Sequence, residues 1–172
     1  GVQGYVVEVC TDAGAWSLGD APLDLSDFAD GAYTVSVTQT DAAGNSSEAA
    51  TAPLTLDTAA PTGALSLEIA GDGVVNAAEA GAAPVSGAGA EAGAAIAIAV
   101  MDGDDVLLTA QVAADDAGAW SLGDAPLDLS DLADGAYTVS VTQTDAAGNT
   151  STAATAPLAV DTAPPSLSDV GL

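Results

Sequence analysis

The 172-residue sequence predicts an all-β protein built from β-sandwich modules in tandem, and three observations support this fold class. Apolar and polar residues alternate with a period of two, as in half-buried strands. Clusters of Gly, Asp, Asn and Ala interrupt these segments about every 8 to 12 residues, as turns do in sandwiches. A long part of the sequence also occurs twice, at a spacing of 104 residues. That spacing is the size of one ordinary sandwich domain.

Seven short segments of the second half of the chain are expected to be strands. In order they are GALSLEIA (63–70), APVSG (83–87), AAIAIAVM (94–101), VLLTAQVA (106–113), AWSLG (119–123), AYTVSVTQT (136–144) and TAPLAV (155–160). Seven antiparallel strands in about 100 residues are typical of the immunoglobulin-like Greek-key sandwich. The loop GDGVVNAAEAGA after the first segment leaves room for one helical turn, and no long helical pattern competes.

Aromatic side chains are expected to support this sandwich. Tyr137, Val139 and Val141 share one face of their strand, and the Tyr137 hydroxyl can cap the corner after the Asp134-Gly135 turn, as Tyr33 can in the first copy. Trp120 and its counterpart Trp16 are expected to anchor a core rich in small residues. The alternative, a sugar-stacking Trp, requires a second exposed aromatic nearby, and none is evident.

The repeat sets the domain organisation. Residues 12–57 return as residues 116–161 with five changes in 46 positions: Phe28/Leu132, Ser46/Thr150, Glu48/Thr152, Thr55/Ala159 and Leu56/Val160. We therefore expect residues 1–57 to be the second half of a truncated module, 58–161 a complete module and 162–172 the start of the next. A half-sandwich exposes its inner faces and edges, so residues 1–57 are not expected to fold alone.

The charge of the chain excludes several classes of function. There are 25 Asp and Glu residues and no Lys, Arg or His, which gives a net charge of -25. Nucleic acids and anionic membrane surfaces are bound through Lys and Arg, so neither is an expected partner. Catalysis that requires His, Lys or Arg is excluded, and no pocket-forming insertion supports a carboxylate-pair glycosidase. The remaining side chains are mainly oxygen ligands, which suit cations.

The composition also bears on membrane insertion and secretion. Hydrophobic residues make up 49% of the chain, which is enough for a core. The sequence contains no run of about 18 apolar residues, so direct membrane insertion is not expected. No signal peptide is visible, so any export signal is expected elsewhere in a longer protein. Cys10 has no partner for an intramolecular disulfide and is expected to be a small strand residue.

Two motifs resemble a known family. The stretch from Asp128 to Ser151, which contains DGAYTVSVTQTDAAGNTS, and the Asp-Thr-Ala-Pro-Pro of 161–165 resemble the bacterial Ig-like repeats of giant RTX-type adhesins and biofilm-associated surface proteins. The acidic loop GDGVVNAAEA (71–80) is also similar to one in that family. The resemblance implies extender modules strung in large numbers between an anchor and a distal ligand-binding region, with calcium rigidifying the junctions.

Sandwich topology independently predicts where cation ligands gather. Loops at the end where the chain enters a module should lie beside its incoming linker, and loops at the other end beside the outgoing linker. The first expected Ca²⁺ cluster contains Asp57, Asp145, Asn149, Glu91 and Asp116 with its neighbour Asp115, joined by Asp27 and Asp30 of the preceding module. The second contains Asp72, Asn76, Glu79, Asp131, Asp134 and Asp161. Such clusters are costly without a counterion and suit calcium with one.

Alternatives to metal binding remain for these loops. Asp and Asn favour turns with or without a metal, so the acidic loops could simply be solvated. The Asp102-Gly103-Asp104-Asp105 cluster is interpreted first as a hairpin turn and only second as a metal site. Asp20, Asp24, Asp124 and Asp128 are interpreted as solvated edges.

The sequence thus favours a calcium-stiffened spacer module of an extracellular bacterial surface adhesin and predicts no enzyme. Its expected partners are the neighbouring modules of the same chain, with the adhesion ligand bound elsewhere in the full-length protein. The alternative is a carbohydrate- or protein-binding Ig-like module, but near-identical copies with few exposed aromatics favour spacing over recognition.

Overall fold

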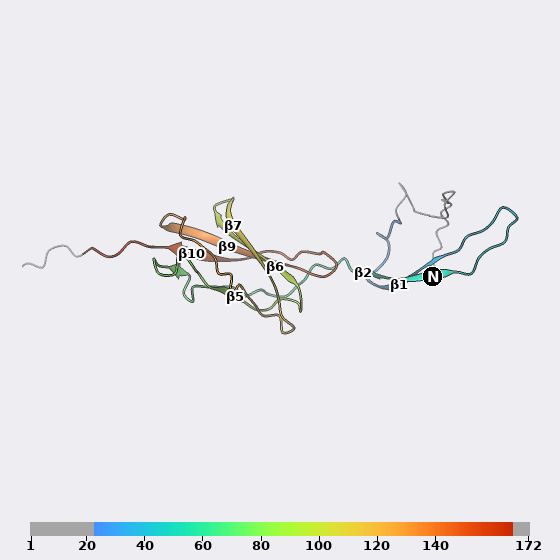
Figure 1. The fold of residues 1–172 in the computed structure, drawn as a ribbon, viewed down its shortest axis with the longest axis horizontal. Coiled ribbons are helices and arrows are strands. Elements are labelled where there is room, and N and C mark those ends of the chain that lie inside the picture. The colour runs from blue at the N-terminus through green and yellow to red at the C-terminus, as the bar shows by residue number, and fades with distance from the viewer. Residues whose placement is uncertain (1–22, 167–172) are drawn as a thin grey trace, which may run out of the picture. The chain divides into compact units, whose positions relative to one another are not determined.

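The computed structural model describes residues 23–166, and the chain forms two compact units, Gly1–Leu56 and Asp57–Leu172 (Figure 1). The expectations for Cys10, Trp16 and Asp20 lie outside the described residues. In the first unit, strands β1 (Gly31–Val37) and β2 (Ala50–Leu56) form an antiparallel pair. No described residue of this unit is buried, so its described part has no closed core.

The second unit is a sandwich of two sheets. A five-stranded sheet has the order β4-β10-β9-β6-β7, and a three-stranded sheet has the order β3-β5-β8. The strands are β3 (Glu68–Ile69), β4 (Val74–Val75), β5 (Val85–Gly87), β6 (Ala95–Asp102), β7 (Asp105–Ala113), β8 (Trp120–Ser121), β9 (Gly135–Thr144) and β10 (Ala154–Val160). Residues 23–166 contain no helix. The predicted all-β, immunoglobulin-like sandwich is therefore confirmed.

The first predicted strand, 63–70, is regular only at Glu68–Ile69. Upstream of it the N–H of Ser66 donates to the Ala88 carbonyl at 2.8 Å, and the hydroxyl of Ser66 accepts the N–H of Ala88 at 2.9 Å. The backbone is also packed closely here, since a Cβ on Gly63 would lie 2.1 Å from the carbonyl oxygen of Gly89. One backbone bond, one side-chain bond and close backbone packing thus hold this segment beside the chain around residue 88 without a regular ladder.

A short strand within the predicted 71–82 loop departs from the antiparallel pattern. Strand β4 pairs in parallel with β10, with Val74 opposite Ala159. The chain reaches it through a left-handed bend, in which Ala70 has a φ of 50° and Gly71 a φ of 80°. Glycine adopts this conformation at little cost. The loop then makes one helical-type turn, in which Ala80 N–H donates to the Asn76 carbonyl at 3.0 Å.

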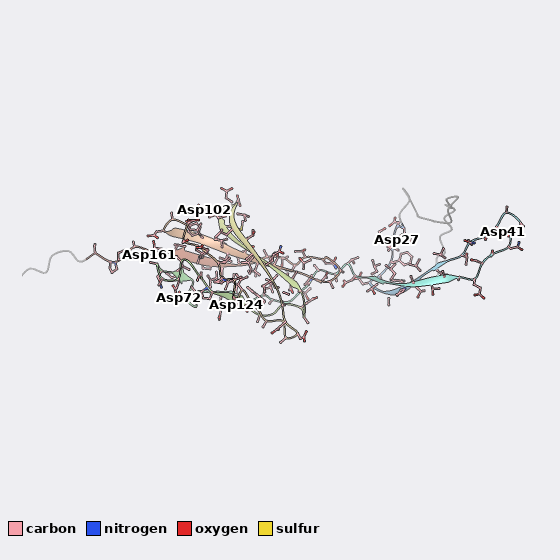
Figure 2. All side chains as sticks on the ribbon, viewed as in Figure 1. Asp27, Asp41, Asp72, Asp102, Asp124 and Asp161 are labelled. Atoms are coloured by element: carbon pink, nitrogen blue, oxygen red, sulfur yellow. The ribbon has the colours of Figure 1, made fainter. Side chains whose placement is uncertain are left out.

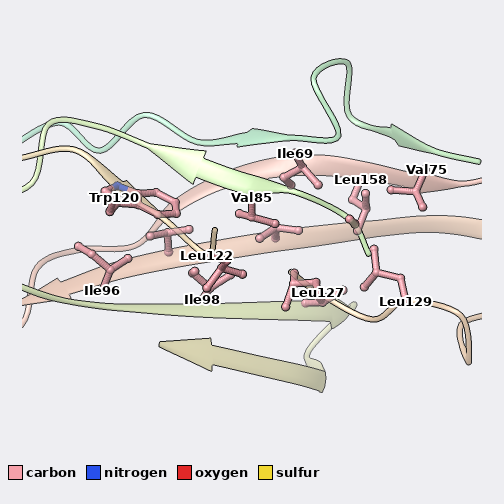
Figure 3. Packing of buried hydrophobic residues seen from close by; sticks show 14 of the residues in the cluster. Ile69, Val75, Val85, Ile96, Ile98, Trp120, Leu122, Leu127, Leu129 and Leu158 are labelled. Atoms are coloured by element: carbon pink, nitrogen blue, oxygen red, sulfur yellow. The ribbon is translucent and has the colours of Figure 1, made fainter. Parts of the chain in front are cut away.

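The core lies between the two sheets (Figure 3). Ile96, Ile98 and Val100 alternate inward along β6 and are at most 1% exposed. Trp120, which is 3% exposed, reaches the same cluster from the smaller sheet. A Cβ on Gly87 would lie 2.3 Å from Cζ2 of Trp120, so the indole rests directly against glycine backbone. Trp120 is the core anchor that the sequence predicted.

Both tyrosine corners form as predicted. The Tyr137 hydroxyl donates to the carbonyl of Ala133 at 2.9 Å, and the Tyr33 hydroxyl donates to that of Ala29 at 2.5 Å. Phe28 packs edge-on against Tyr33, with ring centroids 5.6 Å apart. These bonds fix the turn that precedes β9 in the second unit and β1 in the first.

Candidate junction sites at the two ends of the complete module

The β9–β10 hairpin defines two ends of the complete module. At one end, which we call the incoming end, the Asn149 side chain donates from Nδ2 to the carbonyl oxygen of Asp57 at 3.1 Å. At the other, the outgoing end, Asp134 precedes β9 and Thr162 follows β10, and the two are hydrogen-bonded. Since β10 separates these contacts by seven residues, or about 23 Å of strand, the two linkers attach at opposite ends.

The loop 145–149 at the incoming end is folded around one carboxylate. Asp145 Oδ1 accepts the N–H groups of Ala147 and Asn149, both at 2.9 Å, and Oδ2 accepts Asn149 Nδ2 at 2.9 Å. The Asn149 side-chain bond is the main cause that lowers the pKa of Asp145 below its usual range. The loop therefore keeps this carboxylate ionised and holds the Asn149 amide against the linker.

A buried polar side chain beneath this loop was missed in the sequence. Gln143 is 0% exposed. Its Oε1 accepts the N–H of Glu91 at 2.8 Å, and its Nε2 donates to the carbonyl of Gly63 at 3.4 Å. Gln143 lies on the same inward face of β9 as Tyr137 and Val139. A polar residue in this otherwise apolar alternation was the sequence signal for a buried hydrogen-bonding side chain.

The remaining candidates of the incoming end lie on neighbouring turns. Glu91 is placed there by its backbone bond to Gln143, and Asp115 caps its own turn by accepting Ala119 N–H at 2.8 Å. Asp116 lies in the same turn, which contacts the loop before Glu91 through Ala90 N–H and the Gly118 carbonyl at 3.1 Å.

The second set of predicted calcium ligands lies at the outgoing end. Asp72 and Asp161 both lie there (Figure 2), since Asp161 N–H donates to the Val75 carbonyl at 2.9 Å. Asp72 Oδ1 accepts Val74 N–H at 2.9 Å, and Asp161 Oδ1 accepts Ala163 N–H at 3.2 Å. These carboxylates cap turns of their own chain segments.

Asn76 and Glu79 form a reciprocal cap at this end. Glu79 Oε2 accepts the Asn76 N–H at 3.2 Å and its Nδ2 at 2.6 Å, while Asn76 Oδ1 accepts Ala78 N–H at 2.8 Å. This is the pattern of a capping box. Both side chains therefore have local hydrogen-bond partners without a metal.

Asp134 is bonded across the outgoing end to the linker. Its Oδ1 accepts the Thr162 N–H at 2.9 Å and the Thr162 hydroxyl at 2.7 Å. The Thr162 backbone bond, then the hydroxyl, lowers the pKa of Asp134 below its usual range. Asp131 lies three residues earlier on the exposed turn that follows Asp128.

Asp27 and Asp30 lie on the corresponding turn of the first unit. They occupy the positions of Asp131 and Asp134 one repeat earlier. The turn is closed by a bond from Phe28 N–H to the Leu25 carbonyl at 3.0 Å.

Two residues interpreted as solvated edges have a structural role as well. Asp128 accepts the Ser130 hydroxyl at 2.6 Å and its N–H at 3.1 Å, and Asp24 makes the same pair of bonds with Ser26. The serine hydroxyl is the larger cause of the lowered pKa of each carboxyl. Both are exposed, but each is an Asx-turn cap rather than only a solvated charge.

The predicted calcium ligands do not converge within the described residues. Within residues 23–166, no three or more acidic, His or Cys side chains are grouped closely enough to hold a metal ion. Calcium takes about six to eight oxygen ligands. The predicted carboxylates of either module end therefore do not form a ready calcium site among the described residues.

The Asp102–Asp105 cluster and Trp120 also have roles that the structure decides. Asp102 and Asp105 are paired across the β6–β7 hairpin, with Gly103 at a φ of 59°, which confirms the turn interpretation of this cluster. The buried ring of Trp120 leaves no face for a sugar, so the sugar-stacking alternative is wrong for this residue. No helix in the described part of the chain is long and apolar enough to cross a membrane.

Comparisons with known proteins give a family and several solved structures. The family model described as bacterial Ig-like domain matches residues 3–58 and 70–162, well over half of the chain. A structure from work on host cell surface retention of a 1.5-MDa bacterial ice-binding adhesin is 35% identical, with a TM-score of 0.43 over 77% of this chain and 42% of that one. Comparison with curated proteins gives no match.

Two further solved structures are similar. A tetra-tandem repeat from the extending region of a large adhesion protein is 26% identical, with a TM-score of 0.47 over 81% of this chain and 34% of that one. Domains d3–d4 of the rat CD45 extracellular region are 11% identical, with a TM-score of 0.40 over 92% of this chain and 80% of that one. The chain spans less than half the length of either adhesin structure.

Proposed function

Because the chain belongs to the bacterial Ig-like domain family, we propose that it is an extender segment of a long, repetitive bacterial surface adhesin. The observation that carries this proposal is the 104-residue repeat together with linker contacts at opposite ends of one module. A module that receives the chain at one end and releases it at the other adds its own length to an array.

The near-identity of the two copies also favours spacing. Residues 12–57 and 116–161 differ at only five of 46 positions, and Phe28/Leu132 is the largest of these changes in shape. A recognition surface needs a distinct set of exposed anchors, usually aromatic. Aromatic residues are 3% of the chain, and Trp120 is buried. We propose no catalytic role for this segment.

Calcium is proposed as the ion that stiffens the junctions between modules. The chain has no Lys, Arg or His, so its junction carboxylates have no cationic side chain as a partner, and a counterion must come from solution. Asp57, Asp145, Asn149, Glu91 and Asp116 would contribute at the incoming end, together with Asp27 and Asp30 of the module before. Asp72, Asn76, Glu79, Asp131, Asp134 and Asp161 would contribute at the outgoing end, together with the module after.

This role fits an extracellular protein at the bacterial cell surface. Extracellular modules bind calcium at about 0.1–1 mM, so a junction of this kind would be occupied after secretion. The partners would be the neighbouring modules of the same chain, and the adhesion ligand would be bound elsewhere in the full-length protein.

Thermal unfolding of the 172-residue chain tests the calcium proposal. We expect about 1 mM CaCl₂ to raise Tm above that in chelator, because an ion that binds only the folded state stabilises it. The control is NaCl at matched ionic strength, which screens repulsion between carboxylates without occupying a site. Equal Tm values in the two salts would overturn specific calcium binding.

A further inference from the structure

The linker residues Asp-Thr occur once per repeat, as Asp57-Thr58 and Asp161-Thr162. The complete module contacts the first pair with a side chain of its incoming end and the second pair with a side chain of its outgoing end. The two contacts use different residues of the pair. One therefore does not exclude the other on a single linker.

The incoming contact is made by an amide that the loop itself orients. Asn149 Nδ2 donates to Asp145 Oδ2 at 2.9 Å and to the Asp57 carbonyl at 3.1 Å. The first copy contains the same loop, in which Asn45 Nδ2 donates to Asp41 Oδ2 at 2.8 Å. A carboxylate at this position could accept but not donate, so the contact depends on the donor that the Asn149 amide supplies.

The outgoing contact is made by a carboxylate and uses both donors of a threonine. Asp134 Oδ1 accepts the N–H of Thr162 at 2.9 Å and its Oγ1–H at 2.7 Å. Bonds to an ionised acceptor are stronger than neutral ones. Two donors on one residue also fix the orientation of that peptide unit, which a single bond would not.

We propose that every linker in the array is held by a two-sided hydrogen-bond clamp that needs no metal. The preceding module holds the Thr through its counterpart of Asp134, and the following module holds the carbonyl of the Asp through its counterpart of Asn149. The clamp rests on the proposed function only in that the modules follow one another in tandem. Bending at the linker then requires one of the two contacts to break.

Both halves of the clamp can be measured by NMR on the 172-residue chain in chelator. The N–H of Thr58 belongs to the peptide plane whose carbonyl Asn149 binds, but the clamp also places Asp30, the counterpart of Asp134, on this N–H. In an Asp30→Ala background the order parameter of the Thr58 N–H therefore reports the incoming contact alone. We expect Asn149→Ala in this background to lower the order parameter from about 0.85 toward 0.6, the values of rigid and flexible backbone. Asn45→Ala is the matched control, because it removes the same bond within the loop without touching Asp57.

The outgoing contact is read by amide exchange of Thr162. We expect Asp134→Ala to accelerate this exchange about 3- to 10-fold, the effect of losing an ordinary hydrogen bond. Asp131→Ala removes a carboxylate from the same turn and should leave the rate unchanged. Equal rates in the two variants would overturn the outgoing half of the clamp.

Two results would contradict the proposed contact between Asn149 and the Asp57 carbonyl. In the Asp30→Ala background, an unchanged Thr58 order parameter on adding Asn149→Ala, or an equal fall on adding Asn45→Ala, would overturn it. Should Asn149→Ala unfold, the wild-type chain still decides, because the Asn149 side-chain amide should exchange more slowly than that of Asn45. Equal exchange would contradict the clamp. All these measurements are made without metal, so they are independent of whether calcium binds.

Discussion

Gln143 binds the backbone of Glu91 from inside the core: its Oε1 accepts the Glu91 N–H at 2.8 Å although the glutamine is 0% exposed. The Nε2 of the same side chain donates to the Gly63 carbonyl at 3.4 Å. One buried amide therefore joins β9 to the segment after the incoming linker and to the loop that carries Glu91. The position of the incoming-end loops depends on this residue.

Replacing Gln143 with Leu should destabilise the complete module. The change leaves the Glu91 N–H and the Gly63 carbonyl without their side-chain partner, at an expected cost of about 1–3 kcal/mol. Urea unfolding followed by tryptophan fluorescence measures this loss. The matched control is Gln39→Leu, because Gln39 is exposed at the equivalent position of the first copy and should change stability little. Equal effects of the two variants would contradict this account.

Removing the Tyr137 hydroxyl should weaken the corner before β9. Tyr137→Phe loses the bond to the Ala133 carbonyl but keeps the ring, so we expect a loss of about 0.5–1.5 kcal/mol. Tyr33→Phe breaks the equivalent bond in a unit without a buried core among its described residues, and should hardly change the main unfolding transition. If Tyr33→Phe lowered the free energy of the main unfolding transition as much as Tyr137→Phe does, burial in the core would not be the reason for the loss.

Gly87 should tolerate no side chain. In Gly87→Ala the new Cβ would lie 2.0 Å from the Ser66 carbonyl oxygen and 2.3 Å from Trp120 Cζ2. Overpacking of this kind costs about 1–3 kcal/mol or more. Gly81→Ala is the control, since nothing lies within 4 Å of its added Cβ. Thermal unfolding should separate the two variants clearly, and similar Tm values would contradict the packing described here.

Acid should remove the contribution of the Asp134 contact. The pKa of Asp134 is lowered in the folded chain, chiefly by the Thr162 N–H. A group with a depressed folded pKa stabilises the fold above its unfolded value of about 3.9 and loses that contribution as pH falls through the folded pKa. The stability difference between wild type and Asp134→Ala should therefore shrink from pH 6 to about pH 2. A difference that stays constant over this range would contradict the carboxylate contact.

The fold could be predicted from the sequence because its signals are local. Alternation along Ile96, Ile98 and Val100 identifies β6, and the Asp134-Gly135 turn with Tyr137 identifies the corner before β9. The resemblance of those motifs to bacterial Ig-like repeats is confirmed by the family match. The parallel pairing of β4 could not be predicted, because it depends on a left-handed bend at Ala70 that alternation does not encode.

The sequence predicted which end of the module the junction residues occupy, but not which hydrogen bonds they make there. Sandwich topology correctly brought Asn149 beside Asp57 and placed Asp134 beside the outgoing linker. The reciprocal cap of Asn76 and Glu79 was missed, although an Asn followed three residues later by a Glu is the capping-box signature. Thr162 was missed as the partner of Asp134, since the two are 28 residues apart and belong to two separate motifs whose contact depends on the path of the folded chain. Calcium binding by these residues remains a prediction.

Small-angle X-ray scattering of an array of repeats cut in phase with residues 58–161 tests the central claim most directly. Titration with calcium should extend the array toward a stiff rod whose maximum dimension grows linearly with the number of modules. Chelator should return it to a more flexible state, in which only the hydrogen-bond clamp limits bending. Scattering profiles that are identical in calcium and in chelator would contradict a calcium-stiffened extender.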